Sequence, residues 1–224
     1  IKDLIRQITR SRVYRLSSAY DATSFAADPD NAMLWRHNSR RLESEEVRDA
    51  ILAASGNLDL RPDAGSMIGR AGDGPIGGLR FQAATLEQIA GANNDFRSIY
   101  LPATRSVEPD VLAVFDPADS SATDGERDAT NVPSQALFML NSEFVARQSQ
   151  DLADLTLRKH AGRSALASFS SRLEFVFQRV LNRLPTKSES DAARTLVRKL
   201  DSSSVAWTGV IRGLFGSAEF RFID

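Results

Sequence analysis

The 224-residue chain contains no cysteine. This absence excludes disulfide bonds, cysteine-ligated zinc, thiol catalysis and covalent haem attachment through a Cys-x-x-Cys-His motif within these residues. Lysine is also scarce, because only four of the 28 basic residues are Lys and the other 24 are Arg. Arginine suits bidentate pairing with carboxylates, although such an excess also arises from genomic base composition. We expect no metal site and no cofactor in this chain.

Long apolar runs are missing as well. No stretch approaches the roughly 20 apolar residues that a membrane-spanning helix needs, so we expect no membrane insertion. The formal net charge is −1 and the pI is near 6.2, which provides no overall field to attract nucleic acid. No signal peptide is visible. Composition therefore does not indicate the cellular compartment of the protein.

The chain begins inside a helical pattern. Ile1, Leu4, Ile5 and Ile8 stand at helical spacing with no N-cap before them, which indicates a fragment of a longer protein. An apolar stripe at the start of a fragment needs a partner. We expect further residues of the same polypeptide to cover it.

Most of the remaining pattern also predicts helices. Residues 1–20 favour a helix followed by a Ser-rich break, and residues 41–55 favour a helix that Gly56 ends. Asn131 as a cap and Pro133 in the first turn predict a helix reaching residue 160. Capping-box patterns at residues 171–174 and 186–189, followed by apolar stripes, predict two more helices, and Trp207 belongs to a last one.

Loops separate these helices. Residues 59–78 contain six glycines and two prolines and predict a long loop or flap. Residues 97–103 favour a short edge strand because of Pro102, and residues 116–128 form an acidic loop. We therefore expect a mainly α, irregular helical domain with long loops, at most a short β element and a three-helix C-terminal bundle. Its parts would be residues 1–160 and a subdomain of residues 161–224 packed on them.

The sequence gives little support for the common catalytic and metal-binding motifs. Residues 72–77 match Gly-x-Gly-x-x-Gly by letter, but neither the preceding strand nor the following helix of a dinucleotide site is predicted. His37 and His160 lack the helical companions of a metal site, so structural roles are favoured. A role for His37 as acid or base, beside Arg36 and Trp35, stays open.

The acidic loop is the one candidate for a hard cation. Gly125 as the sixth residue of an EF-hand loop would put Ser120 and Ala122 where carboxylates belong, so that pattern fails. A solvated loop with local Asp turns is the favoured interpretation. Calcium binding remains the alternative.

Two polar features predict internal contacts. Opposite charges recur at three- and four-residue steps in the segment of Arg40, Arg41, Glu45, Arg48 and Asp49, so we expect charge pairs along the helix or to a neighbouring loop.

Asn141 shares a helical arc with Leu137, Leu140 and Phe144, which predicts a buried amide. It should hydrogen-bond backbone in residues 97–104 or 127–132, because an unsatisfied buried amide costs about 1–3 kcal/mol. A ligand contact is the alternative.

Five segments resemble one known family, planctomycete-specific domain one. They are residues 31–50 (Asn-Ala-Met-Leu-Trp-Arg-His-Asn-Ser-Arg-Arg-Leu-Glu-Ser-Glu-Glu-Val-Arg-Asp-Ala), 97–100 (Arg-Ser-Ile-Tyr), 132–141 (Val-Pro-Ser-Gln-Ala-Leu-Phe-Met-Leu-Asn), 179–186 (Arg-Val-Leu-Asn-Arg-Leu-Pro-Thr) and 217–220 (Ser-Ala-Glu-Phe). The family is a domain of unknown function at the C-terminal end of large planctomycete proteins. The resemblance implies a secreted or periplasmic, extracytoplasmic setting, often beside a cytochrome-c-like domain, and it assigns no catalytic residue.

We therefore expect a non-catalytic interaction or scaffolding module of a larger secreted, cytochrome-linked protein. Its partners would be other domains of the same polypeptide, with a glycan or another protein left open and nucleic acid not expected. The alternative is a carbohydrate-active enzyme or glycan-binding domain with a cleft near the Gly-rich and acidic loops. The candidate binding residues are Arg36, Arg97, Asp116, Arg127 and Asn141.

Overall fold

The computed structural model describes residues 1–61, 74–75, 81–82, 95–101, 110–118, 127, 130–160, 165–200 and 204–223. By its internal contacts the chain divides into two compact units. Residues 1–42 together with 221–224 form one, called here the N-terminal unit. Residues 43–220 form the other, called the helical unit.

The N-terminal unit contains two short helices and a two-stranded sheet. Helix α1 is Lys2–Arg10. Helix α2 is Ala22–Ala27 and is capped by Asp21, whose carboxylate accepts a hydrogen bond from the amide of Ser24. Strand β1, Arg40–Arg41, pairs antiparallel with β4, Phe222–Ile223. The helix predicted at the start of the chain is confirmed, and it ends at Arg10.

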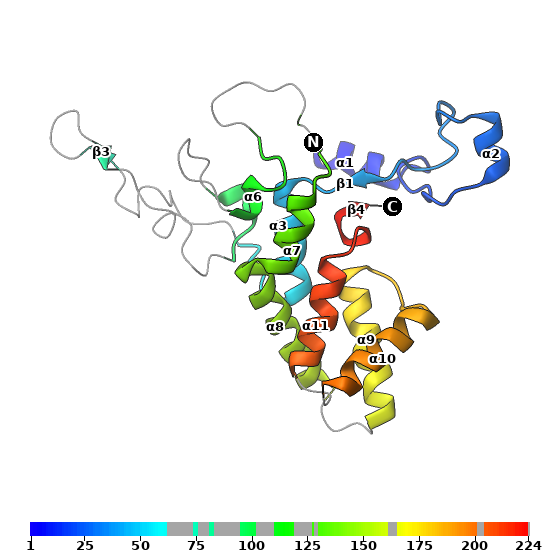
Figure 1. The fold of residues 1–224 in the computed structure, drawn as a ribbon. Helices are drawn as coiled ribbons and strands as arrows, with labels where there is room; N and C mark the ends of the chain where they lie inside the picture. The colour runs from blue at the N-terminus through cyan, green and yellow to red at the C-terminus, as the bar shows by residue number, and fades with distance from the viewer. Residues whose placement is uncertain are drawn as a thin grey trace. The chain divides into compact units, whose positions relative to one another are not determined.

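The helical unit accounts for the mainly α fold class, which is confirmed (Figure 1). Its elements, in chain order, are α3 Ser44–Ser55, β2 Gly74–Pro75, β3 Phe81–Gln82, the 3-10 helix η1 Ser98–Tyr100, α6 Asp110–Ala113, α7 Pro133–Asn141, α8 Glu143–Lys159, α9 Ala165–Val180, α10 Lys187–Lys199, α11 Ser204–Phe215 and the 3-10 helix η2 Glu219–Arg221. The η2 segment leads into β4. Strands β2 and β3 pair antiparallel.

The core of the helical unit lies where α8 and α11 run side by side, with α3 packed on α8 and α9 (Figure 1). Helix α11 contributes Trp207, Ile211 and Phe215, and α8 contributes Val145 and Leu152, all almost completely buried. Each such side chain stabilises the fold by about 1.5–3 kcal/mol relative to an exposed one. The contact of α11 with α8 crosses residue 160, and the predicted division there stays a prediction.

Three helix limits differ from the expected ones. Helix α3 begins at Ser44, because Arg40–Arg41 pair with β4 instead of continuing the helix. The expected single helix over residues 131–160 breaks at Ser142, whose backbone is extended at φ −63° and ψ 133°. Helix α9 begins at Ala165, so residues 171–174 lie inside it and cap nothing.

The expected edge strand is also wrong. Residues 98–100 form η1, because the carboxylate of Asp49 accepts the amide of Ser98 and holds the turn. Most of the Gly-rich segment, including residues 72–73 and 76–77 of its Gly-x-Gly-x-x-Gly match, lies outside the described residues. So do residues 119–126 and 128 of the acidic loop. Within the described part, no helix has the length and apolar content needed to cross a bilayer.

Candidate functional site

Two carboxylates of α3 meet arginines from distant segments. Glu45 and Asp49 lie one turn apart on the helix. Arg127 donates to both carboxylate oxygens of Glu45, at 2.7 and 3.1 Å, and also to Glu43 at 3.2 Å. Burial raises the pKa of Glu45, but the hydrogen bonds from Arg127, from its own backbone and from Ser44, together with the charge of Arg127, outweigh burial, and the net shift is downward. Arg127 therefore joins the segment before α7 to the start of α3.

Asp49 is the centre of the second contact. Its Oδ1 accepts the amide and the hydroxyl of Ser98, both at 2.7 Å, and its Oδ2 lies 3.5 Å from Nε of Arg97. Arg48, only 5% exposed, donates to the carbonyl of Phe96 at 2.8 Å. Burial lowers the pKa of Arg48, and nearby carboxylates, chiefly that of Asp49, oppose this. The predicted charge pairing is confirmed for Glu45, Arg48 and Asp49.

Asp116 fixes the chain that leads into α7. Its backbone is left-handed, with φ +53°, and its carboxylate accepts both the amide and the hydroxyl of Thr130 at 2.9 Å. The fully buried Gln135 donates from Nε2 to the carbonyl of Val114 at 3.2 Å. Its Oε1 has no hydrogen-bond partner in the described part of the chain. This contact was not predicted from the sequence.

Asn141 is placed differently from the prediction. It is exposed at the end of α7, and its Nδ2 donates to the carbonyl of Leu137 in the same helix at 2.9 Å. Leu137 and Leu140 are 58% and 48% exposed, so the supposed buried arc faces outward. The prediction of a buried amide that anchors a loop is wrong, because the break at Ser142 separates this arc from the buried stripe of α8.

Arg97, Asp116 and Arg127 thus each pair or hydrogen-bond with another residue of the protein. Among the described residues, the cavities lined by Arg36, by Asp151 and by Phe169 do not include any of these three side chains. The loops that would form the carbohydrate cleft lie mostly outside the described residues. In the described part, no group of three or more His, Asp or Glu side chains is placed to hold a metal ion.

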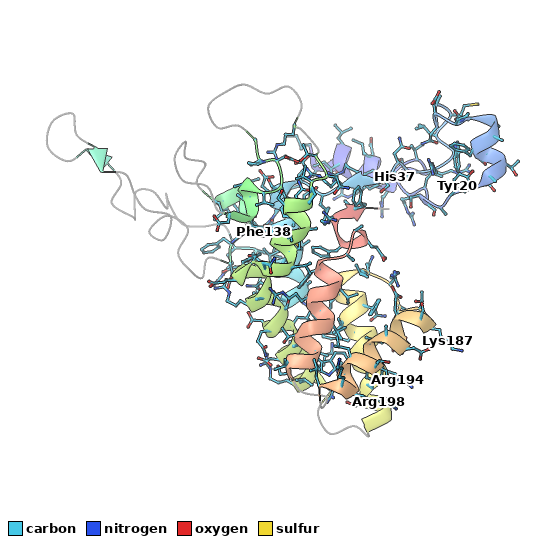
Figure 2. The ribbon with its side chains drawn as sticks, viewed as in Figure 1. Tyr20, His37, Phe138, Lys187, Arg194 and Arg198 are labelled. Carbon is cyan, nitrogen blue, oxygen red and sulfur yellow. The ribbon has the colours of Figure 1, made fainter. Side chains whose placement is uncertain are left out.

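Arg36 lines a cavity of about 750 Å³ within the N-terminal unit. Among the residues that the structure describes, its basic lining is Arg36, His37, Arg40 and Arg41. His37 lies near β1 (Figure 2). The remaining lining residues are Ile8, Ser11, Val13, Tyr14, Asn31, Leu34, Asn38 and Ser39.

The loop that carries Arg36 is held by Asn31 and Asp28. Asn31 is 5% exposed with φ +55°, and its amide accepts from the backbone N–H of Arg36 at 3.2 Å and donates to its carbonyl at 2.9 Å. Asp28 accepts the amides of Ala32 and Met33 at 2.9 and 2.8 Å. Both side chains replace regular secondary structure here. The backbone of Arg36 is therefore fixed.

The side chains of this loop are also positioned. The Arg36 guanidinium lies 4.8 Å from the ring centre of Trp35, and the Trp35 indole donates to the carbonyl of Asp28 at 2.9 Å. The rings of Tyr14 and His37 pack edge to face, with their centres 6.4 Å apart. Arg36 Nε and His37 Nδ1 are buried with no hydrogen-bond partner among the residues described. Arg36 was predicted as a binding candidate, and a role for His37 was left open. The positions of the other residues were not predicted, although Asn31, beside a Pro-containing turn, was a local signal.

The fold and these contacts define a mainly α-helical domain with a separate basic cavity. Residues 1–197 match the model of the family described as PSD1, protein of unknown function (DUF1553), and the chain belongs to this family. No curated protein and no solved structure gave a match. The family resemblance found in the sequence is thereby confirmed, and the family carries no described activity.

Proposed function

We propose that this domain is a non-catalytic interaction module whose N-terminal unit packs against other domains of the same polypeptide. The observation that carries the proposal is the composition of its interior. In the part of this unit that is described, Asn31 and Arg221 are the buried residues, and no apolar side chain is buried. The apolar residues of the core all lie between Val47 and Phe220.

The exposed stripe of α1 supplies the surface. Ile1, Leu4, Ile5 and Ile8 are 100%, 60%, 53% and 50% exposed, although their spacing places them on one face of the helix. A unit of this size buries too little apolar surface to be stable on its own. Covering the stripe would stabilise the complex by roughly 25 cal/mol for each Å² of apolar surface removed from water.

The distribution of charge also favours the N-terminal unit as the interaction surface. The N-terminal unit has nine basic and five acidic residues, a formal net charge of +4, although the whole chain is at −1. A partner with acidic residues around an apolar strip would complement it and be selected by it. In the helical unit, Arg97, Asp116 and Arg127 each have an internal partner, which favours structural roles over catalytic ones.

The proposal also includes the location of the protein and its association with another domain. A secreted or periplasmic location and a link to a cytochrome-like domain rest on the family resemblance alone. They agree with a module that has no catalytic assignment and needs a neighbour to cover it.

Hydrogen–deuterium exchange with mass spectrometry tests the proposal. The 224-residue chain would be compared with the full natural polypeptide. We expect the amides of α1 to exchange rapidly in the 224-residue chain and to be protected in the longer protein, because bound helices open less often. Helix α8, which lies in the core, should be protected in both.

A matched pair of variants locates the contact. In the longer protein, Ile5→Glu should remove the protection of α1, whereas Gln7→Glu, which adds the same charge at an exposed position off the stripe, should retain it. Equal, rapid exchange of α1 in both proteins would show that nothing in the polypeptide covers this face.

A further inference from the structure

We propose that the cavity of the N-terminal unit is the anchoring pocket of the docking surface on α1, and that its occupant is an amphipathic helix with acidic flanks from another part of the same polypeptide. This inference rests on the proposed function and adds the chemical class of the partner and the way in which the partner binds. Amphipathic helices bind in this way when the apolar side chains of one face enter an apolar groove.

The cavity continues the apolar stripe of α1. Ile8 is the last residue of the stripe and also lines the cavity. Val13, Tyr14 and Leu34 continue the wall, and each is about half exposed. A cavity of about 750 Å³ lies in the size range of pockets that enclose drug-sized ligands, so it has room for several apolar side chains. A helix that covers α1 can therefore extend into the cavity past the shared Ile8.

Leu34 is held in the cavity wall in a conformation that leucine rarely adopts. Its φ is +54°, in the left-handed region, and its N–H donates to the carbonyl of Asn31 at 3.1 Å. A bulky residue at positive φ is strained, and such strain persists where the surrounding structure fixes it, often at binding sites. Here the strained position presents a half-exposed leucine to an apolar cavity. A binding role is favoured over a role in the core, because half of the side chain stays in contact with water.

The charge beside this surface identifies the flanks of the partner. Residues 4–20 contain no Asp and no Glu. Arg10, Arg12 and Arg15 are exposed, and their side chains have no ion-pair or hydrogen-bond partner in the described part of the chain. Two of these arginines are chain neighbours of residues in the cavity wall. Carboxylates on the partner would pair with them and fix its orientation.

The shape of the surface favours a helix over a membrane. A basic amphipathic helix such as α1 is also the type that lies on anionic bilayers. A bilayer surface is flat on this scale and would leave the cavity empty, whereas the side chains of a helix would fill it.

Two designed peptides test the class of partner. Both form the same amphipathic helix with Leu and Trp on the apolar face, and the polar face carries Glu in one peptide and Lys in the other. Binding of the fluorescein-labelled peptides to the 224-residue chain would be followed by fluorescence anisotropy. We expect the acidic peptide to bind at least about tenfold more tightly, because its carboxylates complement the unpaired arginines.

Equal affinities of the two peptides, or no binding of the acidic one, would overturn the proposal. A chain that fails to bind the acidic peptide but binds vesicles of palmitoyloleoyl-phosphatidylglycerol would have an anionic membrane as its occupant instead.

A matched pair of variants tests whether the cavity takes part. Val13→Gln places a polar group in the apolar wall and should weaken binding of the acidic peptide by about tenfold or more, as expected at the centre of an interface. Val205→Gln, the same substitution at an exposed position of α11, should leave binding unchanged. Equal affinity of the two variants would show that the peptide does not use the cavity.

A measurement on the unaltered chain guards against misfolding of the variant. In a sample with labelled methyl groups, the signals of Val13 and Leu34 should shift on addition of the acidic peptide, and that of Val205 should stay in place. Stationary signals of Val13 and Leu34 with a bound peptide would overturn the assignment of the cavity.

The same variants in the full natural polypeptide separate this inference from the docking proposal. Hydrogen–deuterium exchange should show α1 protected in the unaltered protein and in Val205→Gln, and less protected in Val13→Gln. Protection of α1 that Val13→Gln leaves unchanged would retain docking along the stripe and overturn the anchoring pocket. Rapid exchange of α1 in the unaltered protein would refute docking itself and with it the partner proposed for the cavity.

Discussion

At the scale of single residues, the important amide of α7 is Gln135 and not Asn141. Gln135 and Met139, four residues apart, are buried, whereas Leu137 and Leu140 are about half exposed. The helix thus presents a polar residue to the interior and leucines to its surface. Hydrophobic periodicity alone could not show this, because the true arc contains an amide whose acceptor is the carbonyl of Val114.

Substitution of the two amides should therefore have unequal effects. Gln135→Ala should lower the free energy of unfolding by about 1–3 kcal/mol, because Val114 loses a hydrogen bond and a cavity forms. Asn141→Ala should cost less than about 0.5 kcal/mol, as is usual for an exposed position. Urea unfolding of both variants measures the difference. A larger loss from Asn141→Ala would restore the original prediction.

At the scale of elements, α3 is stabilised at both ends. Glu43 and Glu46 form a capping box at its start. At its end Gly56 adopts the left-handed conformation at φ +89°, and Arg179 of α9 donates to the carbonyls of Ala54 and Ala53 at 2.6 and 2.8 Å. The last carbonyls of a helix lack internal partners, so an arginine from another helix satisfies them and binds the two elements together.

Two glycine substitutions should change stability in opposite directions. Gly56→Ala should cost about 1 kcal/mol or more, because φ is positive there and the new Cβ would lie 3.4 Å from the Arg179 guanidinium. Gly213→Ala, inside α11 with open space around the new Cβ, should add about 0.5–1 kcal/mol. Thermal unfolding of both variants tests this pair. Stabilisation by Gly56→Ala would refute the account of the helix end.

Elements with local signals were predictable from the sequence. Helix α10 begins at the expected Thr186 and Glu189 capping box, and α3 ends at the expected Gly56. The break at Ser142 and the 3-10 helix η1 were not predictable. The first has no Pro or Gly to mark it, and the second depends on Asp49, which is 49 residues away from Ser98 along the chain.

The same limit applied to the candidate sites. Arg36 and Arg127 were identified as notable arginines, but their surroundings were not. Arg127 finds Glu45 across 82 residues, a distance that no local pattern spans. His37 was visible beside Arg36, yet much of the apolar wall of the cavity comes from Ile8, Val13 and Tyr14, more than 20 residues earlier in the chain.

At the scale of the whole molecule, a charged cluster joins the last helices to the end of the helical unit. Arg183, after α9, donates to both carboxylate oxygens of Glu189 in α10, at 2.9 and 2.7 Å, and also pairs with Glu219 of η2. Its guanidinium lies 5.4 Å from the ring centre of Phe177. Hydrogen bonding from Arg183 lowers the pKa of Glu189 to about 2.

This pKa gives stability a defined pH dependence. Because the ordinary pKa is 4.5 and the folded pKa is about 2, the contribution of Glu189 is complete above pH 4.5 and is lost as the pH falls toward 2. The difference in unfolding free energy between the unaltered chain and Glu189→Gln should therefore shrink over that interval. Solvent screening reduces its size, since the side chain is about one third exposed.

Chemical denaturation at pH 5 and at pH 2.5 measures this effect. Asp191→Asn, which removes an exposed carboxylate from the same helix, serves as the control and should show a smaller change between the two pH values. A constant difference between the unaltered chain and Glu189→Gln would show that the pair with Arg183 adds nothing to folding.

The uneven distribution of charge has a practical consequence for handling the protein. The helical unit has 19 basic and 24 acidic residues, a formal net charge of −5, against +4 for the N-terminal unit. The isoelectric point near 6.2 is therefore an average of two unlike parts. At neutral pH a cation-exchange resin can retain this slightly acidic chain through its N-terminal unit, while an anion-exchange resin retains it through the helical unit.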